Sequence, residues 1–212
     1  MLRALWEISA PVVASTTNAF NDLGYAYARP EVARLADGRW AAFISNGYGS
    51  NSGVAALYVV DIRDGSLIRK IVINSSETGN GLSSVKLRVN SQNVVQAAYG
   101  GDLKGRMWKF DLSGTSPTAW GVAFAGQPLF TTSGGATQPI TVQPLLADNP
   151  QGGTQVFFSA PASSTKPRIN STRTCKGSTR YGTPPAVPGK SPCRACRPSR
   201  SRECSQAARG SS

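Results

Sequence analysis

The sequence predicts an all-β fold, namely a partial β-propeller of two to three four-stranded antiparallel blades followed by a disordered basic tail. Near residue 110, Trp108, Phe110 and Leu112 alternate with Met, Lys and Asp, as is typical of a half-buried β-strand. The same pattern lies 50 residues earlier, where Tyr58 corresponds to Trp108, and each copy ends in Asp, a hydrophobic residue and a glycine turn. A strand repeated at this interval indicates propeller blades. No segment has a convincing 3.6-residue apolar period, which argues against long helices.

The first blade is expected to hold four antiparallel strands joined by short turns. Asp37-Gly38 and Asp64-Gly65 are strong hairpin dipeptides. The longer connection Asn46–Gly53 consists of turn-forming residues. The strands are predicted at 30–35, 40–45, 55–62 and 66–73.

A second blade and the start of a third follow, and the partial propeller is predicted to span residues 5–159. The second blade has expected strands at 85–89, 94–99, 106–112 and 120–124. Residues 126–130 lead towards a third blade, whose first two strands are predicted at 138–145 and 154–158. Residues 5–8 are interpreted as the last strand of a preceding blade. Because a closed ring needs about four to eight blades, we expect this chain to be part of a larger ring.

Residues 160–212 differ abruptly from the body and are predicted to be disordered. They carry 11 Lys and Arg against one acid, whereas residues 1–159 carry 12 against 10. They also contain seven prolines and a single aromatic residue, so they cannot bury enough surface to offset chain entropy. The change falls within the expected strand 154–158. We therefore interpret the tail as the product of a shifted reading frame in a GC-rich gene.

Composition excludes several classes of site, and no catalytic, cofactor-binding or metal-binding residue is predicted. The chain has no histidine, which excludes Ser-His-Asp triads and His-liganded metals. No apolar run is long enough to span a bilayer, and residues 1–10 are too short and polar for a secretory signal. The loop Asn46–Gly53 lacks the Lys-Ser/Thr ending and the helix of a phosphate cradle.

Individual side chains have a structural and a functional interpretation. Asp102 and Asp111 are expected to shape turns rather than to catalyse. Three tryptophans are expected to pack in the core or between blades, with stacking on a sugar or a base as the alternative; they are Trp40, Trp108 and Trp120.

The tail offers two further candidates, and neither is favoured. All four cysteines lie there, and Cys193 and Cys196 form a CxxC pair that partly resembles a zinc site. The other two, Cys175 and Cys204, stand at spacings that fit no common zinc finger. The basic charge could attract nucleic acid weakly and without specificity, and nucleic acid is not expected as a partner.

The body resembles the C-terminal propeller of the PilC/PilY proteins, the tip-associated adhesins and assembly factors of bacterial type IV pili. The resemblance covers roughly residues 5–158, while members of that family are far longer. The segments that carry it are Leu23–Gly53, Leu57–Ile71, Asn80–Ser84, Tyr99–Gly114, Pro128–Phe130 and Gln138–Thr141.

The resemblance implies a non-catalytic fragment of a protein of pilus assembly, surface adhesion and twitching motility. The implied partners are minor pilins of the pilus tip and a host or abiotic surface. The implied location of the full-length parent is the cell surface, at the pilus tip or outer membrane. The alternative is a quinoprotein dehydrogenase-like propeller enzyme, which needs an acidic base and calcium ligands that the body does not concentrate.

The family commonly carries a calcium loop of the form Asp-x-Asn-x-Asp-x-x-x-Asp before the YxGDLxG strand. In this chain the loop 88–96 looks degenerate, and no cofactor is expected. An arginine at a ligand position repels a cation, and calcium prefers several carboxylate oxygens. The ligand positions hold Arg88, Asn90, Gln92, Val94 and Gln96.

Overall fold

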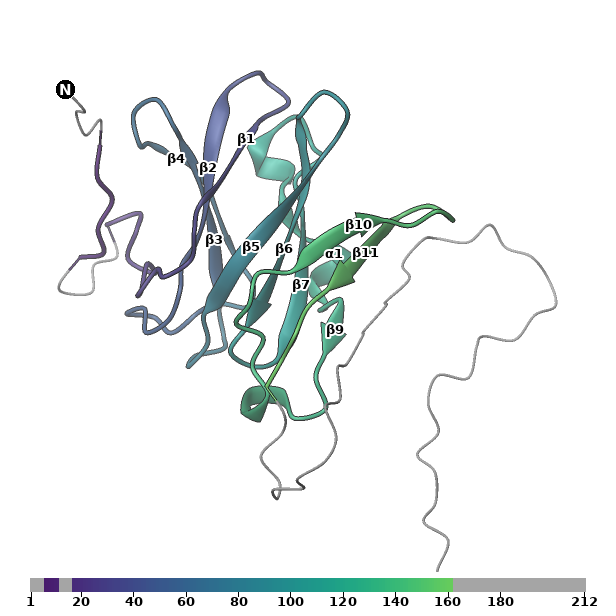
Figure 1. Ribbon diagram of the computed structural model, residues 1–212. Coiled ribbons are helices and arrows are strands. Elements are labelled where there is room, and N and C mark those ends of the chain that lie inside the picture. Colours follow the sequence, from purple (N-terminus) through teal and green to yellow (C-terminus); the bar gives the residue numbers. More distant parts are fainter. Residues whose placement is uncertain (1–5, 12–16, 162–212) are drawn as a thin grey trace, which may run out of the picture. The chain divides into compact units, whose positions relative to one another are not determined.

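The computed structural model describes residues 6–11 and 17–161, which form three antiparallel sheets (Figure 1). Strands dominate these residues and helix is limited to three single turns. The predicted all-β architecture is thereby confirmed. The expected tail lies outside the described residues from residue 162 onward.

The first sheet is a four-stranded blade in which consecutive strands are neighbours. Short turns set this order; at the first of them Gly38 takes a positive φ of 90° and the backbone N–H of Arg39 donates to Asp37 Oδ1 at 3.0 Å. Each predicted strand is present within two residues of its expected bounds. The strands are β1 (Glu31–Arg34), β2 (Trp40–Ser45), β3 (Ala56–Asp61) and β4 (Leu67–Val72).

The second sheet repeats this arrangement but breaks its outer strand into two pieces. Its first three strands are β5 (Leu82–Val89), β6 (Val95–Asp102) and β7 (Arg106–Asp111). Two short strands then pair with different parts of β7, namely β8 (Gly121–Val122) and β9 (Phe130–Thr131).

The expected fourth strand at 120–124 and the expected link at 126–130 are therefore wrong in their bounds. Phe124 and Ala125 adopt left-handed φ values of 55° and 53°, so the chain leaves the ladder after Val122. A single helical turn, α1 (Ala123–Gly126), forms there, and the chain returns to the same blade at Phe130. Two 3₁₀ turns lie on either side, η1 (Pro117–Ala119) and η2 (Gly135–Thr137).

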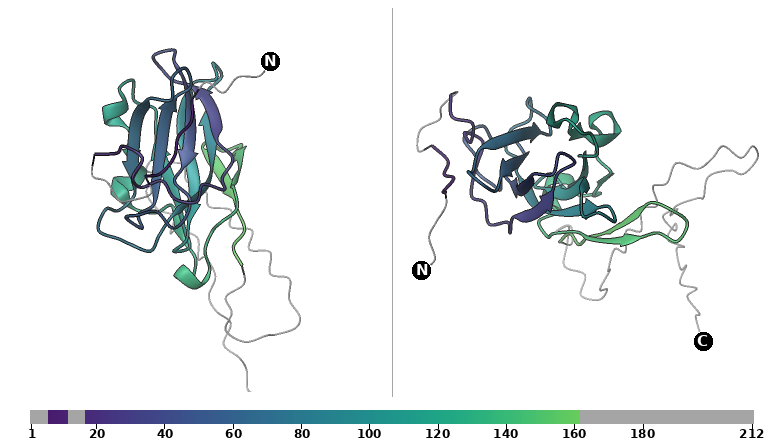
Figure 2. Two further views of the ribbon diagram at one scale, coloured as in Figure 1. Left: turned by 90° about the vertical axis from the view of Figure 1, so that its left-hand side faces the viewer. Right: turned by 90° about the horizontal axis from the view of Figure 1, so that it is seen from above.

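The third sheet is a two-stranded hairpin of β10 (Leu145–Asp148) and β11 (Thr154–Phe157). The second strand agrees with the prediction, but the strand predicted at 138–145 is wrong, because pairing begins only at Leu145. Pro139 and Pro144 in that segment lack the N–H that a ladder requires. Figure 2 shows the hairpin beside the second sheet, next to β5.

The N-terminal segment 6–11 covers the first blade without forming the expected strand. Trp6 donates its indole N–H to the carbonyl of Ile62 at 2.8 Å. Its ring lies directly over Gly65, where any side chain would collide with it. Trp6 and Ile8 thus pack on the outer face of the blade, together with the buried side chains of Leu23, Tyr58 and Val60.

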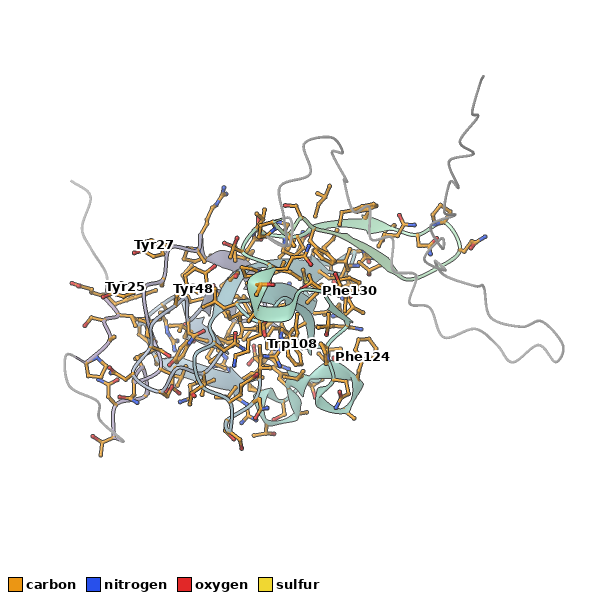
Figure 3. The ribbon with its side chains drawn as sticks, turned by 90° about the horizontal axis from the view of Figure 1, so that it is seen from below. Tyr25, Tyr27, Tyr48, Trp108, Phe124 and Phe130 are labelled. Atoms are coloured by element: carbon orange, nitrogen blue, oxygen red, sulfur yellow. The ribbon has the colours of Figure 1, made fainter. Side chains whose placement is uncertain are left out.

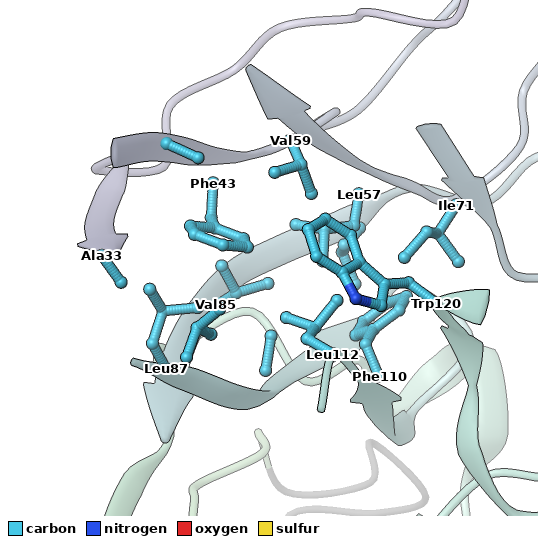
Figure 4. Close-up of a cluster of buried hydrophobic side chains, with 14 of the residues drawn as sticks. Ala33, Phe43, Leu57, Val59, Ile71, Val85, Leu87, Phe110, Leu112 and Trp120 are labelled. Atoms are coloured by element: carbon cyan, nitrogen blue, oxygen red, sulfur yellow. The ribbon is translucent and has the colours of Figure 1, made fainter. Parts of the chain in front are cut away.

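The largest core lies between the first and second sheets (Figure 4). Phe43, Leu57 and Val59 of the first sheet face a layer contributed by the second. That opposing layer includes Val85, Leu87, Phe110, Leu112 and Trp120. The two sheets therefore pack face to face as successive propeller blades do.

Candidate functional site

Asp102 is fully buried, with 0% of its surface exposed, and accepts five hydrogen bonds. Oδ1 accepts from the backbone N–H groups of Lys104 at 3.0 Å and Arg106 at 2.8 Å, which closes the β6–β7 turn. Oδ2 accepts from the side chains of Asn80 at 3.0 Å, Arg106 at 2.9 Å and Trp108 at 2.9 Å. The predicted turn-shaping role is confirmed. The carboxylate is fully occupied by structural donors, so it has no lone pair directed at a substrate.

Arg106 neutralises this buried carboxylate and connects it to a second acid. Its guanidinium lies 2.8 Å from Asp102 and 2.5 Å from Glu77, and it covers the Trp108 ring at 5.0 Å. Burial alone would lower the pKa of Arg106, but the hydrogen bonds and charges of Glu77 and Asp102 raise it above its ordinary value. Lys104 adds a 3.4 Å contact to Glu77. The cluster pairs two acids with two basic side chains, so its formal charges balance.

Asn46 forms an equivalent polar centre between the first and second blades. Its amide nitrogen donates to the carbonyls of Asp22 at 2.8 Å and Val54 at 2.7 Å. Its amide oxygen accepts from the N–H groups of Ala56 at 3.0 Å and Leu82 at 3.1 Å. One buried side chain thus joins a preceding loop, the start of β3 and the start of β5. Sequence reasoning placed Asn46 in a turn and missed these contacts, although a polar residue directly after a buried strand is a usable signal.

Asp111 holds the turn after β7, as predicted. Its Oδ1 accepts from the backbone N–H of Ser113 at 3.0 Å and from its hydroxyl at 2.7 Å. These hydrogen bonds hold the pKa of Asp111 below its ordinary value. The side chain is exposed, so this turn contributes no buried charge.

The tryptophans divide into two groups. Trp108 and Trp120 are buried in the core between the blades, as predicted, and Trp120 donates to the carbonyl of Gly114 at 2.7 Å. Trp40 differs from the packing expectation, because it stands at the first position of β2 and 50% of its surface is exposed. It lines a hollow of about 370 Å³ together with Glu31 and Lys86.

The glycine-rich loop 46–53 connects two strands and does not form a phosphate cradle. Gly47 and Gly49 take positive φ values of 70° and 65°, and the loop leads into β3 rather than into a helix. In a P-loop the phosphate is held at the N-terminal N–H groups of a following helix, which this loop lacks. The structure therefore supports the turn interpretation of this loop.

The loop 88–96 is a tight hairpin turn between β5 and β6. Asn90 Oδ1 accepts from the N–H groups of Gln92 at 3.0 Å and Val94 at 2.9 Å, so the turn itself uses this oxygen. Asn93 takes a left-handed φ of 58°, which completes the reversal.

The charged and amide side chains of this loop are also directed towards other groups. Arg88 pairs with Asp148 of β10 at 2.5 Å. Gln96 donates its amide N–H to the carbonyl of Val95 at 3.0 Å. Within residues 6–11 and 17–161, no group of three Asp, Glu, His or Cys side chains is placed to hold a metal ion. The cysteines fall outside the described residues.

A known family matches the chain segment that contains both blades. This segment includes the polar centres at Asp102 and Asn46. Residues 2–182 match the family described as the PilY1 beta-propeller domain. The chain belongs to the PilY1 β-propeller family. The match continues through residue 182, beyond the boundary at residue 159 that composition suggested.

Individual PilY1 relatives and a solved PilY1 structure are also similar to this chain. The type IV pilus biogenesis factor PilY1 of Pseudomonas aeruginosa (strain UCBPP-PA14) is 37% identical over 173 residues, covering 70% of this chain and 14% of the relative. A PilY1 homolog of Xylella fastidiosa is 34% identical over 172 residues, covering 73% and 11%. The crystal structure of the P. aeruginosa PilY1 C-terminal domain superposes with a TM-score of 0.61 at 39% identity, covering 66% of this chain and 33% of that chain.

This chain therefore corresponds to a minor part of the PilY1 relatives it matches. It spans about a seventh of the P. aeruginosa protein, as the 14% coverage indicates. In the part of the chain that the structure describes, no helix is both long and apolar enough to cross a membrane.

Proposed function

We propose that this chain is a non-catalytic segment of a PilY1-type propeller in a protein of type IV pilus biogenesis. The observation that carries the proposal is the use of the buried polar groups. Asp102 and Asn46 direct their hydrogen-bonding atoms at turns and strand ends. Such groups stabilise a scaffold, because their polar atoms are used by the protein's own donors and acceptors. The names of the relatives, which are biogenesis factors, agree with this role.

The blade faces support the proposal that this segment belongs to a larger ring. The outer face of the first blade buries Tyr58 and Val60 under an irregular N-terminal segment rather than under a sheet. The far face of the second blade buries Met107 and Ile140 beneath a hairpin of two strands. Both faces are apolar, as required for further blades to stack on each side.

The finer role that we propose follows the family resemblance. The full-length parent would act at the cell surface, at the pilus tip or outer membrane, in surface adhesion and twitching motility. Its partners would be minor pilins and a host or abiotic surface. The 212-residue chain alone would not perform this role, because the matched relatives are several times longer.

Complementation of a strain lacking the parent gene tests the proposal. We expect the full-length parent to restore surface pili, and a parent lacking residues 17–161 to fail. The 212-residue chain alone should also fail. Recovery of piliation by that chain, or by the parent without the segment, would contradict the proposal. Adhesion and twitching zones measured in the same strains separate the finer roles from assembly.

Two buried acids, Asp102 and Asp22, do not supply the acidic base that the quinoprotein alternative needs. Asp102 is saturated by donors and Asp22 is paired with Lys70 at 2.7 Å. An assay of quinone-dependent alcohol oxidation with added calcium should give no turnover above the buffer control. Turnover that depended on both quinone and calcium would favour the enzyme.

A further inference from the structure

Two tyrosine rings form an exposed stack beside the first blade. Tyr25 and Tyr27 have 67% and 82% of their surface exposed. Their ring centroids are 6.2 Å apart and their planes differ by 19°, which is a near-parallel arrangement. Figure 3 shows both rings with Tyr48 at one margin of the molecule, well away from Phe124 and Phe130. Exposed apolar surface that is contiguous, as it is in this stack, marks interaction sites, whereas singly exposed rings do not.

The backbone beneath the stack is fixed by the neighbouring loop. The N–H of Tyr25 donates to the carbonyl of Tyr48 at 2.7 Å, and the N–H of Tyr48 donates back at 3.4 Å. Gly47 has a φ of 70°, and a side chain there would collide with the Tyr25 carbonyl. The Tyr25 ring lies over Gly49, where an added Cβ would come within 3.2 Å of it. The absence of side chains at Gly47 and Gly49 thus lets the Tyr25 backbone and ring lie directly against the loop.

A small hollow lined by hydroxyl groups adjoins the rings. Its volume is about 160 Å³, below the range of about 300–1,000 Å³ typical of sites for drug-sized ligands. The lining contains no charged side chain. Its members are Tyr25, Tyr27, Ala28, Gly47, Tyr48, Leu82, Ser83, Ser84 and Thr141.

The hydrogen bonds around this hollow leave capacity for a ligand. The Ser83 hydroxyl donates its proton to the carbonyl of Ile140 at 2.8 Å. Tyr48, whose hydroxyl oxygen lies 2.9 Å from Ser83 Oγ, must then be the donor in that contact. The Tyr48 oxygen keeps a lone pair to accept from a ligand. Ser84 and Thr141 add hydroxyls that can both donate and accept.

We infer that Tyr25, Tyr27 and the adjoining hollow form a binding site for a neutral saccharide. A sugar ring presents an apolar C–H face and a rim of hydroxyl groups. The exposed Tyr27 ring can take the apolar face, and the rim can exchange hydrogen bonds with Tyr48, Ser84 and Thr141. The absence of lining charge disfavours phosphates, carboxylates and nucleic acid, all of which need cationic partners. The small volume fits one sugar unit at a time.

The test measures binding of methyl glycosides of glucose, galactose, mannose and N-acetylglucosamine by saturation-transfer NMR and calorimetry. The 212-residue chain is used if circular dichroism and a cooperative melt show that it is folded, and the full-length parent otherwise. At least one glycoside should bind the wild-type protein. Tyr27→Ala should weaken that binding about tenfold, the loss of one aromatic contact, while Tyr27→Phe should retain it. Trp40→Ala, which removes another half-exposed aromatic, should leave the affinity unchanged.

Three results would overturn the inference. The first is a folded protein that binds none of the glycosides. The second is equal binding by wild type and Tyr27→Ala, or equal weakening by Trp40→Ala. The third is a glycoside that binds the short chain but not the full-length parent, which would mean that the parent covers the rings. None of these results bears on pilus assembly, so this inference and the proposed function can fail separately.

Discussion

The indole N–H of Trp108 donates a 2.9 Å hydrogen bond to Asp102 Oδ2, which joins the core between the blades to the β6–β7 turn. The same carboxylate closes that turn through two backbone N–H groups. Each of the five donors offsets part of the cost of burying this acid, since an unpaired buried polar group is destabilising. The position of Trp108 in the core and the shape of the turn are therefore coupled.

Replacing Asp102 with alanine should destabilise the fold strongly. The change leaves the Trp108 indole, the Asn80 amide and Arg106 without their buried acceptor, and we expect a loss of about 3–5 kcal/mol in the free energy of unfolding. Urea unfolding followed by tryptophan fluorescence measures it. Asp111→Ala is the matched control, because Asp111 holds a similar turn at an exposed position and should cost about 1 kcal/mol or less. Equal losses in the two variants would show that burial of Asp102 is unimportant.

Asn46→Ala should weaken the junction between the first and second blades. The substitution leaves the N–H groups of Ala56 and Leu82 without an acceptor in a buried site. We expect a loss of at least about 2 kcal/mol in unfolding free energy. Hydrogen exchange of the Leu82 amide should accelerate at the same time. Asn51→Ala, an exposed change in the same loop, should alter neither quantity, and a comparable effect there would contradict the role of Asn46.

The ion pair between Asp22 and Lys70 should make stability fall in acid. Burial alone would raise the pKa of Asp22, but hydrogen bonds from Lys70 and Ser52 hold it below its ordinary value of 3.8. A carboxyl with a lowered folded-state pKa stabilises the fold above its unfolded pKa, and this contribution disappears as the pH falls through the folded-state pKa. Melting temperatures between pH 6 and pH 2.5 should therefore drop more for wild type than for Asp22→Asn. Parallel curves would show that Asp22 is not a source of acid sensitivity.

Calcium should not stabilise the hairpin turn at 88–96. The Asn90 oxygen is used by the turn, and Arg88 places a positive charge there, so the melting temperature should not change during a calcium titration. A calcium-dependent rise that vanished in Asn90→Ala would refute this. The combined change Arg88→Asp, Gln92→Asp and Gln96→Asp should create binding. It also releases Asp148 from its arginine partner, which leaves another carboxylate near the loop.

The strands predicted from sequence agree best with the structure where turn-forming dipeptides flank segments of alternating apolar and polar residues. Asp37-Gly38 and Asp64-Gly65 fix the ends of neighbouring strands, and Tyr58 and Trp108 occupy the third strand of successive blades on the face directed at the preceding blade. The 50-residue interval between Tyr58 and Trp108 therefore corresponds to the step from one blade to the next. The outer strand of the second blade was mispredicted because Phe124 and Ala125 are not residue types that favour a positive φ.

Features that depend on tertiary contacts were not predictable in the same way. The four hydrogen bonds of Asn46 reach residues up to 36 positions away, so its place after a buried strand signals a polar role but does not identify its partners. The Tyr25–Tyr27 pair stands two residues apart, as side chains on one face of an extended segment do, but its exposure follows from how the loop at Gly47 and Gly49 lies beneath it. Trp40 was expected in the core because its size favours burial, yet its place at a strand end leaves it half-exposed.

The last prediction concerns the origin of the basic sequence that follows residue 159, of which residues up to 182 still fall within the family match. The charge changes there from nearly balanced to 11 basic residues against one acid, and every cysteine lies beyond it. The hairpin strand β11 ends at Phe157 as the second strand of a blade, and the four-stranded first blade indicates that two more strands should follow it. A basic tail would ordinarily follow a completed blade rather than interrupt one.

Translating the coding DNA between codons 159 and 182 in its other two frames tests this directly, because the composition changes at the first position and the family match ends at the second. We expect one frame to continue with alternating apolar strands, glycine turns and aromatic residues, as the missing half of the third blade requires. The cysteines and arginines encoded after the change of frame would then carry no function. If both other frames meet stop codons quickly, the tail is native sequence. Its charge would in that case point to a contact with an anionic surface or nucleic acid, to be tested by the salt dependence of binding.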